Sequence, residues 1–279
     1  MNFLKKLEAV SKKNNSIISI GLDSDMQRLP KAVMGSNDPV FVFNKRIIDR
    51  TSHLVCAYKL NLSFYESLGS KGWKSLEKTL KYIPEKIVTI ADSKRGDIGN
   101  SSRKYAEAFF DTLSFDAVTV NPYMGFDSLE PFLKYGDRGI FILCLTSNPG
   151  SSDFQKIKDE NGVPLYLRVA KKIKEWNRYG NCCAVVGATH PEELKEIRKI
   201  LDNIPILIPG IGAQEGDLEK SVKWGTDPEG KYAIFNVSRA IIFASSGENF
   251  DKEAEKRCEE LRDQINLYLD EKKKNLKGK

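Results

Sequence analysis

Histidine is scarce in this chain. Only two histidines, His53 and His190, occur among the 279 residues, so a metal site built from several histidines is excluded. A Ser-His-Asp triad is disfavoured as well, because neither histidine stands in a recognisable catalytic context. Both are expected to be ordinary residues at helix ends. The chemistry of the protein is therefore expected to depend on lysine, aspartate, arginine and backbone groups.

The sequence also lacks the cysteine pattern of a zinc site or a disulfide framework. Its five cysteines form no C-x-x-C pair, and their number is odd. Most of them stand in apolar, strand-like runs, where a reduced thiol behaves as a small hydrophobic side chain. We expect buried free thiols at Cys56, Cys144, Cys182, Cys183 and Cys258.

Long hydrophobic runs and one-sided charge are absent too. No apolar run approaches the roughly 20 residues that cross a bilayer, and Met1–Lys6 carries no feature of a secretory signal. The 44 basic and 38 acidic residues give a net charge of +6, and the clearest basic run, Lys272–Lys274, lies in a polar tail. These features predict a cytoplasmic protein with no membrane and no nucleic-acid partner, whereas the modest positive charge suits a small anionic substrate.

Short β-branched runs alternate with helical patterns along the whole chain, and no linker or repeat divides it. We expect one domain over residues 1–279. The runs are continuously apolar, as in parallel strands that are covered on both faces. They predict a (β/α)8 TIM barrel, with a doubly wound open sheet as the alternative, although that fold's Gly-rich first turn is missing. The eight predicted strands are Ile17–Asp23, Leu54–Asn61, Ile87–Asp92, Ala117–Asn121, Gly139–Thr146, Cys182–Gly187, Ile206–Pro209 and Ala233–Val237.

Two of the intervening helices show clear apolar stripes. Leu165, Val169, Ile173 and Trp176 recur at spacings of four and three, which predicts one buried helix face. A second stripe, at Ala254, Cys258, Leu261 and Ile265, predicts a helix from Phe250 to Leu269 that closes the chain.

Polar side chains follow most of the predicted strands at the point where each strand ends. In a (β/α)8 barrel these ends meet at one face, where the loops build the active site. The convergence therefore predicts a catalytic pocket at this face. The strand-end residues are Asp23, Lys59, Asn61, Asp92, Lys94, Asn121, Thr146, Ser147, Pro209, Gly210, Ser238 and Arg239.

The end of the third strand carries a D-x-K-x-x-D pattern. Strand alternation places Asp92 and Lys94 on one face, and two following glycines can turn Asp97 away from the strand. Lys59 ends the neighbouring strand and should meet this cluster. Two lysines and two aspartates carry no net charge together, and buried charges are tolerated only in such an alternating network. A charged surface loop is the alternative, but it leaves Lys59 unexplained.

The last two strand ends are expected to bind phosphate, as the loops after strands seven and eight often do in barrels. Gly210 and Gly212 would let backbone N–H groups approach a phosphate, and Arg239 can grip it with two hydrogen bonds. The loop Pro209–Asp217 is a candidate lid over the bound phosphate.

Taken together, these motifs resemble the signature of the orotidine 5′-phosphate decarboxylase family. The similarity runs across nearly the whole chain in the right order, and its most specific part is the D-x-K-x-x-D core with its upstream lysine. The resemblance implies a (β/α)8 barrel that converts orotidine 5′-monophosphate to uridine 5′-monophosphate and carbon dioxide, with no metal and no organic cofactor.

The resemblance also implies roles for individual residues. The charged tetrad would be Lys59, Asp92, Lys94 and Asp97, with Lys94 protonating C6 of the pyrimidine. Asp97 and Ser101 would reach the active site of the partner in a homodimer, although many relatives carry Thr where this chain has Ser101. Substrate contacts would come from Asp23 and Asn61 at the ribose, Thr146 and Ser147 at the pyrimidine, and Gln214 and Arg239 at the phosphate, with Pro209, Gly212 and Ser238 also in the binding site.

Two other functions stay open on the sequence. A related barrel enzyme decarboxylates a 3-keto sugar phosphate through a magnesium-stabilised enediolate, and it shares the D-x-K-x-x-D core. A non-catalytic sensor of a phosphorylated ligand, or a nucleic-acid-binding module, would explain the positive charge but not the converging Lys and Asp side chains. Because no second domain is seen, a separate orotate phosphoribosyltransferase would supply the substrate, and its association with this protein is an open possibility.

Overall fold

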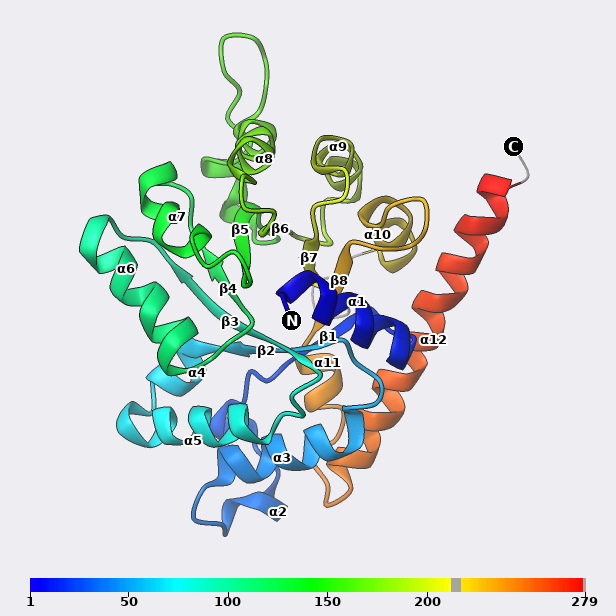
Figure 1. Cartoon of the computed structure of the whole chain (residues 1–279). Helices are drawn as coiled ribbons and strands as arrows, with labels where there is room; N and C mark the ends of the chain where they lie inside the picture. Colours follow the sequence, from blue (N-terminus) through cyan, green and yellow to red (C-terminus); the bar gives the residue numbers. More distant parts are fainter. Residues whose placement is uncertain (212–216, 278–279) are drawn as a thin grey trace.

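The computed structural model describes residues 1–211 and 217–277. Eight parallel strands close into a barrel in the order β1 to β8, and each strand pairs with its neighbours in the sequence while β8 pairs back to β1. The predicted (β/α)8 barrel is confirmed, and the alternative of an open sheet is wrong (Figure 1). The strands are β1 (Ile18–Gly21), β2 (Ala57–Asn61), β3 (Val88–Arg95), β4 (Ala117–Val120), β5 (Gly139–Leu145), β6 (Cys182–Val186), β7 (Ile206–Pro209) and β8 (Ala233–Val237).

All eight predicted strands are present, and the differences lie at their ends. The prediction began β2 three residues too early, because Leu54 donates its backbone N–H to Thr51 in a turn that follows a helix. It ended β3 three residues too early, at Asp92, whereas the strand continues to Arg95 after a shift of register against β4. That shift matters for the site described below.

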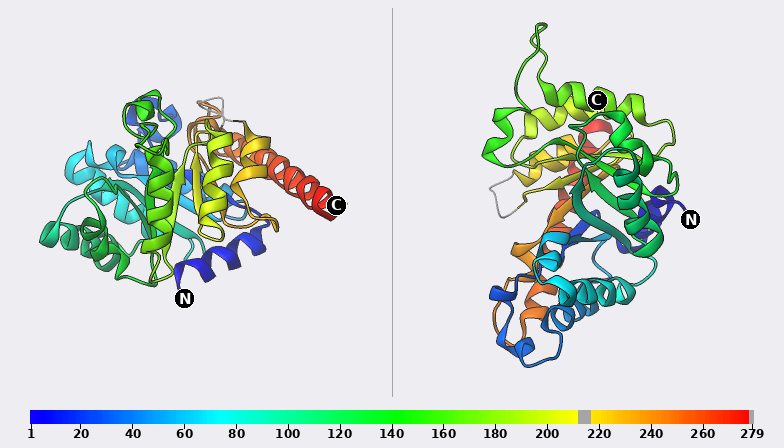
Figure 2. Two further views of the ribbon diagram at one scale, coloured as in Figure 1. Left: turned by 90° about the horizontal axis from the view of Figure 1, so that it is seen from above. Right: turned by 90° about the vertical axis from the view of Figure 1, so that its left-hand side faces the viewer.

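Helices surround the barrel, as Figures 1 and 2 show from three directions. The last helix, α12, runs along the outside, and its C-terminal part projects beyond its neighbours (Figure 2). The helices are α1 (Phe3–Asn14), η1 (Met26–Arg28), α2 (Lys31–Met34), α3 (Pro39–Thr51), α4 (Leu62–Glu66), α5 (Gly69–Tyr82), α6 (Gly99–Glu107), η2 (Ala108–Thr112), α7 (Phe126–Leu133), η3 (Pro149–Asp153), α8 (Leu165–Trp176), α9 (Pro191–Leu201), α10 (Leu218–Gly225), α11 (Arg239–Ile242) and α12 (Phe250–Lys277).

Helix α1 closes the amino-terminal end of the barrel. Phe3 packs edge-on against Phe141 of β5, with 5.7 Å between the ring centroids. Gly139 gives it the space to do so, because a Cβ atom at this position would lie 2.8 Å from the Phe3 ring. The opposite, carboxyl end of the barrel is therefore the one left for a site.

The helix stripes are partly as predicted. In α12 the stripe of Ala254, Cys258, Leu261 and Ile265 is buried, and the helix runs on to Lys277. In α8 the prediction of Leu165 as a buried residue is wrong: it is 37% exposed, because the buried face is rotated onto Tyr166, Ala170 and Ile173.

The five cysteines are buried and unpaired, as predicted. Burial raises the pKa of Cys56 and of Cys144 to about 12, so these thiols stay protonated and act as apolar side chains. Among the described helices, none combines the length and the apolar character that a membrane crossing requires.

Candidate active site

Three charged side chains meet where β2 and β3 end. Lys59 Nζ lies 2.6 Å from Asp92 Oδ2, and Lys94 Nζ lies 2.5 Å from Asp92 Oδ1. The two strands pair with Lys59 opposite Ile90 and Asn61 opposite Asp92, so Lys59 stands two residues before the level of Asp92, and its long side chain spans that difference. Lys59 is 4% exposed and Asp92 is 9% exposed, whereas 48% of the Lys94 side chain faces solvent. The aspartate is thus held between one buried and one accessible ammonium group.

Lys94 reaches Asp92 by way of an irregular backbone. Its φ angle is +48°, in the left-handed region that side chains other than glycine rarely adopt. The register of β3 against β4 shifts between Ala91 and Arg95, as at a β-bulge. Strand alternation therefore predicted the right pair of residues. The Lys94 side chain, however, is directed toward Asp92 by a bulge and not by a regular strand. Strain of this kind is typical of functional sites.

Thr119 of β4 is a site residue that sequence reasoning missed. Its Oγ1 accepts a hydrogen bond from the Lys94 backbone N–H at 2.9 Å and donates one to Asp92 Oδ1 at 3.1 Å. One hydroxyl thus stabilises both the left-handed backbone and the carboxylate. The only signal in the sequence is a polar residue inside the apolar run of β4, and threonine is common in strands.

The two lysines control the ionisation of Asp92. Burial alone would raise the pKa of this carboxyl group, but the positive charges of Lys59 and Lys94 outweigh it and hold the pKa well below its usual range. For Lys59, burial works to lower the pKa, yet the charges of Asp92 and Asp23 raise it above its ordinary value. Both groups are therefore ionised at neutral pH.

The predicted ribose residues lie beside this array. Asp23 Oδ1 is 3.9 Å from Lys59 Nζ, and this oxygen is buried without a hydrogen-bond partner among the described residues. Asn61 directly precedes α4, and its Oδ1 accepts hydrogen bonds from the backbone N–H and the hydroxyl of Ser63. Both side chains stand at strand ends, next to Lys59.

Asp97 and Ser101 of the same chain do not contact the array of Lys59, Asp92 and Lys94. Asp97 lies after β3, and its Oδ1 accepts a hydrogen bond from the backbone N–H of Ile98. Both residues line an outer depression of about 490 Å³, together with Lys104 and Tyr105. Of the four predicted tetrad members, the structure thus brings together three.

The backbone N–H, the hydroxyl and the carbonyl oxygen of Thr146 all have side-chain partners. Its N–H donates to Gln155 Oε1 at 2.7 Å, and its hydroxyl accepts from Gln155 Nε2 at 2.8 Å and donates to Asn148 at 2.7 Å. Its carbonyl oxygen lies 3.1 Å from His190 Nε2. Sequence analysis missed Gln155, which stands in a loop without a pattern, and it assigned His190 only to a helix end. Ser147 follows directly.

The predicted phosphate side of the barrel is described in part. Pro209 ends β7, and Ser238 follows β8 and donates its hydroxyl hydrogen to the Gly21 carbonyl oxygen at 2.9 Å. Arg239 is the first residue of α11 and is exposed. Gly212 and Gln214, like most of the predicted lid, lie outside the described residues.

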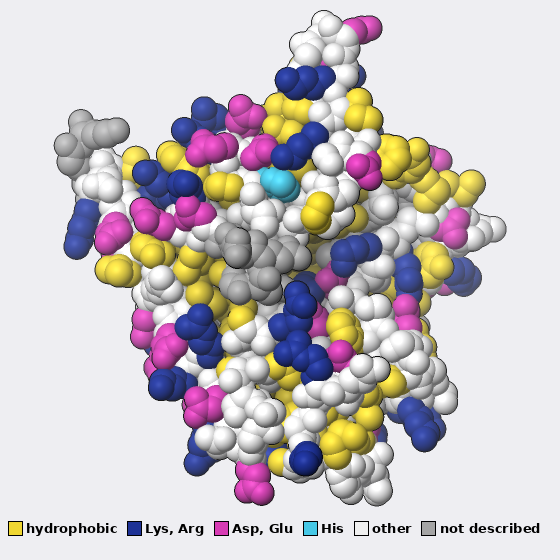
Figure 3. Space-filling view, turned by 180° about the vertical axis from the view of Figure 1, so that it is seen from behind, with side chains coloured by type: hydrophobic (Ala, Val, Ile, Leu, Met, Phe, Trp, Pro, Cys, Tyr) yellow, Lys and Arg dark blue, Asp and Glu magenta, His cyan; other side chains and the backbone are white. Residues whose placement is uncertain are grey.

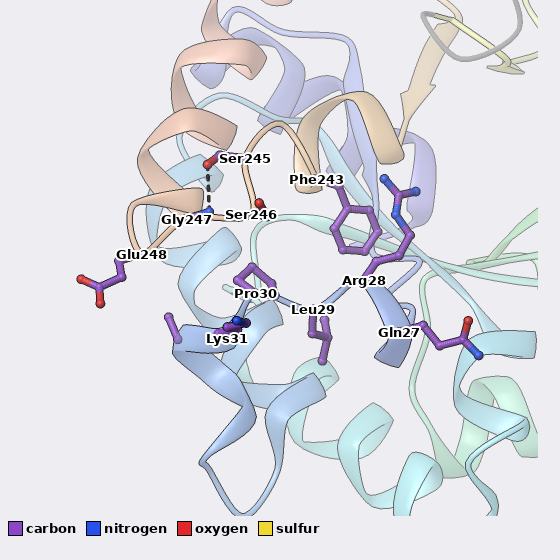
Figure 4. Close-up of a pocket in the computed structure, with 11 residues that line it drawn as sticks. Gln27, Arg28, Leu29, Pro30, Lys31, Phe243, Ser245, Ser246, Gly247 and Glu248 are labelled. Atoms are coloured by element: carbon purple, nitrogen blue, oxygen red, sulfur yellow. Dashed lines mark hydrogen bonds between the residues drawn. The ribbon is translucent and has the colours of Figure 1, made fainter.

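A broad depression of about 740 Å³ lies elsewhere, between η1–α2 and the loop that follows α11 (Figure 4). Arg28 and Lys31 line one wall, Ser245 and Glu248 line the other, and the Arg28 guanidinium lies 4.3 Å from the centre of the Phe243 ring. None of the charged residues described above lines this depression, so we do not assign the active site to it despite its volume.

On the face shown in Figure 3, Lys and Arg side chains lie among Asp and Glu side chains. Within residues 1–211 and 217–277, no group of three or more His, Cys, Asp or Glu side chains is arranged to hold a metal ion.

Fold and site together define a class: a (β/α)8 barrel enzyme with a Lys-Asp-Lys array at the carboxyl ends of β2 and β3. The sequence model described as "Orotidine 5′-phosphate decarboxylase / HUMPS family" matches residues 33–253. The chain belongs to this family, and it is an enzyme of the carboxy-lyase class.

Individual relatives agree with this assignment. An orotidine 5′-phosphate decarboxylase of Dehalococcoides mccartyi (strain BAV1) is 50% identical over 96% of this chain and 98% of its own length. The crystal structure of a putative orotidine-monophosphate-decarboxylase from Toxoplasma gondii has a TM-score of 0.84 and 35% identity over 95% of this chain and 97% of that one. Leishmania donovani UMP synthase has a TM-score of 0.83 and 35% identity over 94% of this chain, which covers 57% of that longer protein.

Proposed function

We propose that this enzyme decarboxylates orotidine 5′-monophosphate to uridine 5′-monophosphate and carbon dioxide, without metal or organic cofactor, as the last step of UMP biosynthesis. The observation that carries the proposal is the buried Asp92 carboxylate between the ammonium groups of Lys59 and Lys94. The names of relatives at 50% identity support the substrate.

Loss of carbon dioxide from C6 leaves an electron pair in the plane of the pyrimidine, where no carbonyl group can delocalise it. A positioned cation is the natural catalyst for such an anion. Lys94 suits this role because its side chain is half-exposed while its ammonium group is fixed by Asp92. In the proposal it stabilises the carbanion and then donates the proton to C6.

Repulsion between Asp92 and the substrate carboxylate cannot supply the catalysis alone. Two unit charges about 4 Å apart repel by about 4 kcal/mol at an effective dielectric of 20. That energy corresponds to roughly three powers of ten in rate. Both oxygens of Asp92 are already engaged by lysines, which weakens the repulsion further. Stabilisation of the carbanion by Lys94 therefore has to dominate.

The remaining substrate contacts follow the positions of the strand ends. Asp23 and Asn61 would bind the ribose, because both stand beside Lys59. Thr146 and Ser147 would lie near the pyrimidine. Gln214 and Arg239 would bind the phosphate, and Pro209, Gly212 and Ser238 would also belong to the binding site.

We also infer a homodimer in which Asp97 and Ser101 reach the active site of the partner. Within one chain these residues lie on an outer depression, away from the array. Large apolar side chains are exposed close by: Ile98 is 58% exposed, and Met124, 43% exposed, would lie 3.2 Å from a Cβ atom at Gly96. Such a surface is typical of a protein interface.

The proposal includes a cytoplasmic location and one domain over residues 1–279. The substrate would come from a separate orotate phosphoribosyltransferase. An association between the two enzymes is an open part of the proposal.

The test is to mix the purified protein with orotidine 5′-monophosphate and to follow the loss of pyrimidine absorbance, with and without EDTA. We expect turnover at the same rate in both. The matched control is the same assay with a 3-keto sugar phosphate in the presence of magnesium, which should give no carbon dioxide. Turnover of the sugar phosphate that stops on addition of EDTA would favour the related magnesium enzyme, and no turnover of either substrate would favour a non-catalytic phosphate sensor.

A further inference from the structure

A fully buried cluster of polar side chains lies directly behind Asp23. It consists of Ser24, Asn44 on α3, Tyr65 on α4 and Thr79 on α5, and each of these residues is at most 1% exposed. Buried polar groups cost stability unless each finds a partner. The cluster therefore has to be well ordered to be tolerated.

Asn44 is the centre of this cluster. Its Oδ1 accepts a hydrogen bond from the Ser24 hydroxyl at 2.5 Å, and its Nδ2 donates to Tyr65 Oη at 3.0 Å and to Thr79 Oγ1 at 3.1 Å. Tyr65 in turn donates its own hydrogen to the Leu22 carbonyl oxygen at 3.0 Å, and Thr79 donates to a backbone carbonyl of α5. Every hydrogen has one acceptor, so each group can lie in only one orientation.

The ends of this network hold the two residues that flank Asp23. Leu22 is bound through its carbonyl oxygen and Ser24 through its hydroxyl, so the peptide between them is fixed at both sides. The Asp23 side chain leaves the network and places Oδ1 3.9 Å from Lys59 Nζ. This oxygen is buried without a hydrogen-bond partner in the part of the chain that the structure describes, so its position depends on the backbone that the network holds.

The same network reaches the second predicted ribose residue. Asn61 caps the first turn of α4, and Tyr65 lies one turn further along this short helix. Fixing Tyr65 therefore fixes the position of α4, and with it Asn61.

We propose that Asn44, acting through Tyr65 and Ser24, is a positioning residue that sets Asp23 and Asn61 for recognition of the ribose hydroxyl groups of the nucleotide. This inference rests on the proposed function and adds the residues that determine its selectivity for a ribonucleotide. Asn44 itself lies behind the site, so it acts only through the strand end that it holds.

The experiment compares Tyr65→Phe with Tyr58→Phe. Tyr58 is an equally buried tyrosine on β2 whose hydroxyl pairs with Thr51 at 2.7 Å, whereas the Tyr65 hydroxyl bonds Leu22. Calorimetry would measure the binding of uridine 5′-monophosphate and of its 2′,3′-dideoxy analogue to each variant and to the parent. We expect Tyr65→Phe to lower the preference for the ribonucleotide at least about fivefold, mainly by weakening its binding.

Tyr58→Phe loses one buried hydroxyl as well, so it controls for the loss of stability, and we expect its preference to stay within about twofold of the parent. Ser24→Ala, which releases the other flank of Asp23, should also lower the preference. An unchanged preference in Tyr65→Phe, or an equal loss in Tyr58→Phe, would overturn the inference while the parent still decarboxylates orotidine 5′-monophosphate. A parent that neither binds nor decarboxylates these nucleotides would overturn the proposed function itself, and the inference with it.

Discussion

Two sets of buried charged side chains, one at each end of the barrel, are partnered in different ways. At the amino end, Arg198 of α9 is buried and donates five hydrogen bonds to four backbone carbonyl oxygens, those of Asp202, Ile204, Gly225 and Tyr232. These carbonyls belong to the segments that enter β7 and β8 and to the end of α10. One side chain thus joins several elements, and each of its bonds ends on a neutral group.

At the carboxyl end, charges meet other charges and the backbone is strained. Lys59, Asp92 and Lys94 form a chain of ion pairs, Lys94 has a left-handed backbone, and one oxygen of Asp23 has no partner among the described residues. Such an arrangement adds little to stability, because the cost of burying the ions offsets much of their attraction. The amino end therefore stabilises the fold, and the carboxyl end carries the chemistry, as is general in this architecture.

Lys94→Ala tests most strongly whether the carboxyl end of the barrel carries the chemistry and not the stability. We expect a loss of kcat of roughly 10⁴-fold or more, because the variant removes both the proton donor and the cation beside the developing carbanion. Binding of uridine 5′-monophosphate should persist, and the unfolding temperature should change little. Steady-state kinetics, calorimetry and thermal unfolding check the three expectations.

The matched control is Lys78→Ala, which removes a lysine of similar exposure that pairs with Asp38 at 2.8 Å, far from the array. It should keep the activity of the parent.

Mixing Lys94→Ala with an inactive Asp97→Ala variant should restore roughly a quarter of the parent activity. Half of the reassorted dimers would be heterodimers, and each of these would hold one complete site out of two. Activity of Lys94→Ala within tenfold of the parent would show that the acid is another residue, and no recovery on mixing would place Asp97 outside the partner's site.

Arg198→Lys tests the other end. A lysine keeps the charge but cannot reach four carbonyl groups with its compact ammonium, so we expect the free energy of unfolding to fall by about 2–4 kcal/mol. The kcat of the folded enzyme should stay the same. Denaturant titration measures the first effect, and Arg257→Lys, at an exposed arginine of α12, is the control with no expected loss. If the folded Arg198→Lys enzyme had a kcat clearly below that of the parent, the division of roles between the two ends of the barrel would be wrong.

The barrel could be predicted because its signals are local. Eight apolar runs, each bounded by polar residues, mark strands that are covered on both faces. The errors fall where tertiary contacts decide. Leu165 fits the stripe of α8 by spacing but lies outside, because Tyr166 can pack its large ring against the sheet instead. The end of β3 was missed because a bulge has no sequence pattern of its own.

The candidate site was predictable to the extent that it is made of strand ends. Lys59, Asp92 and Lys94 follow from the barrel and its register. Residues that hold these side chains from behind carry no such signal: Thr119 looks like an ordinary strand threonine, and Asn44 looks like a polar residue of an amphipathic helix. Their roles depend on hydrogen bonds between elements far apart in the sequence, which only the assembled fold reveals.

Thr119→Val gives the smallest expected effect and the finest test of the comparison. The variant keeps the shape of the side chain but removes the acceptor for the Lys94 N–H and a donor to Asp92. We expect kcat to fall about tenfold, as the loss of these two hydrogen bonds behind Lys94 and Asp92 would cause, with KM nearly unchanged. Thr226→Val is the control. Thr226 directly follows α10 at the amino end of the barrel, and its hydroxyl donates a hydrogen bond to the Val222 carbonyl oxygen at 2.7 Å. It should lower stability and leave kcat intact. The reverse pattern, with kcat lost in Thr226→Val and kept in Thr119→Val, would mean that strain at Lys94 does not depend on Thr119 and that the two ends are not separable.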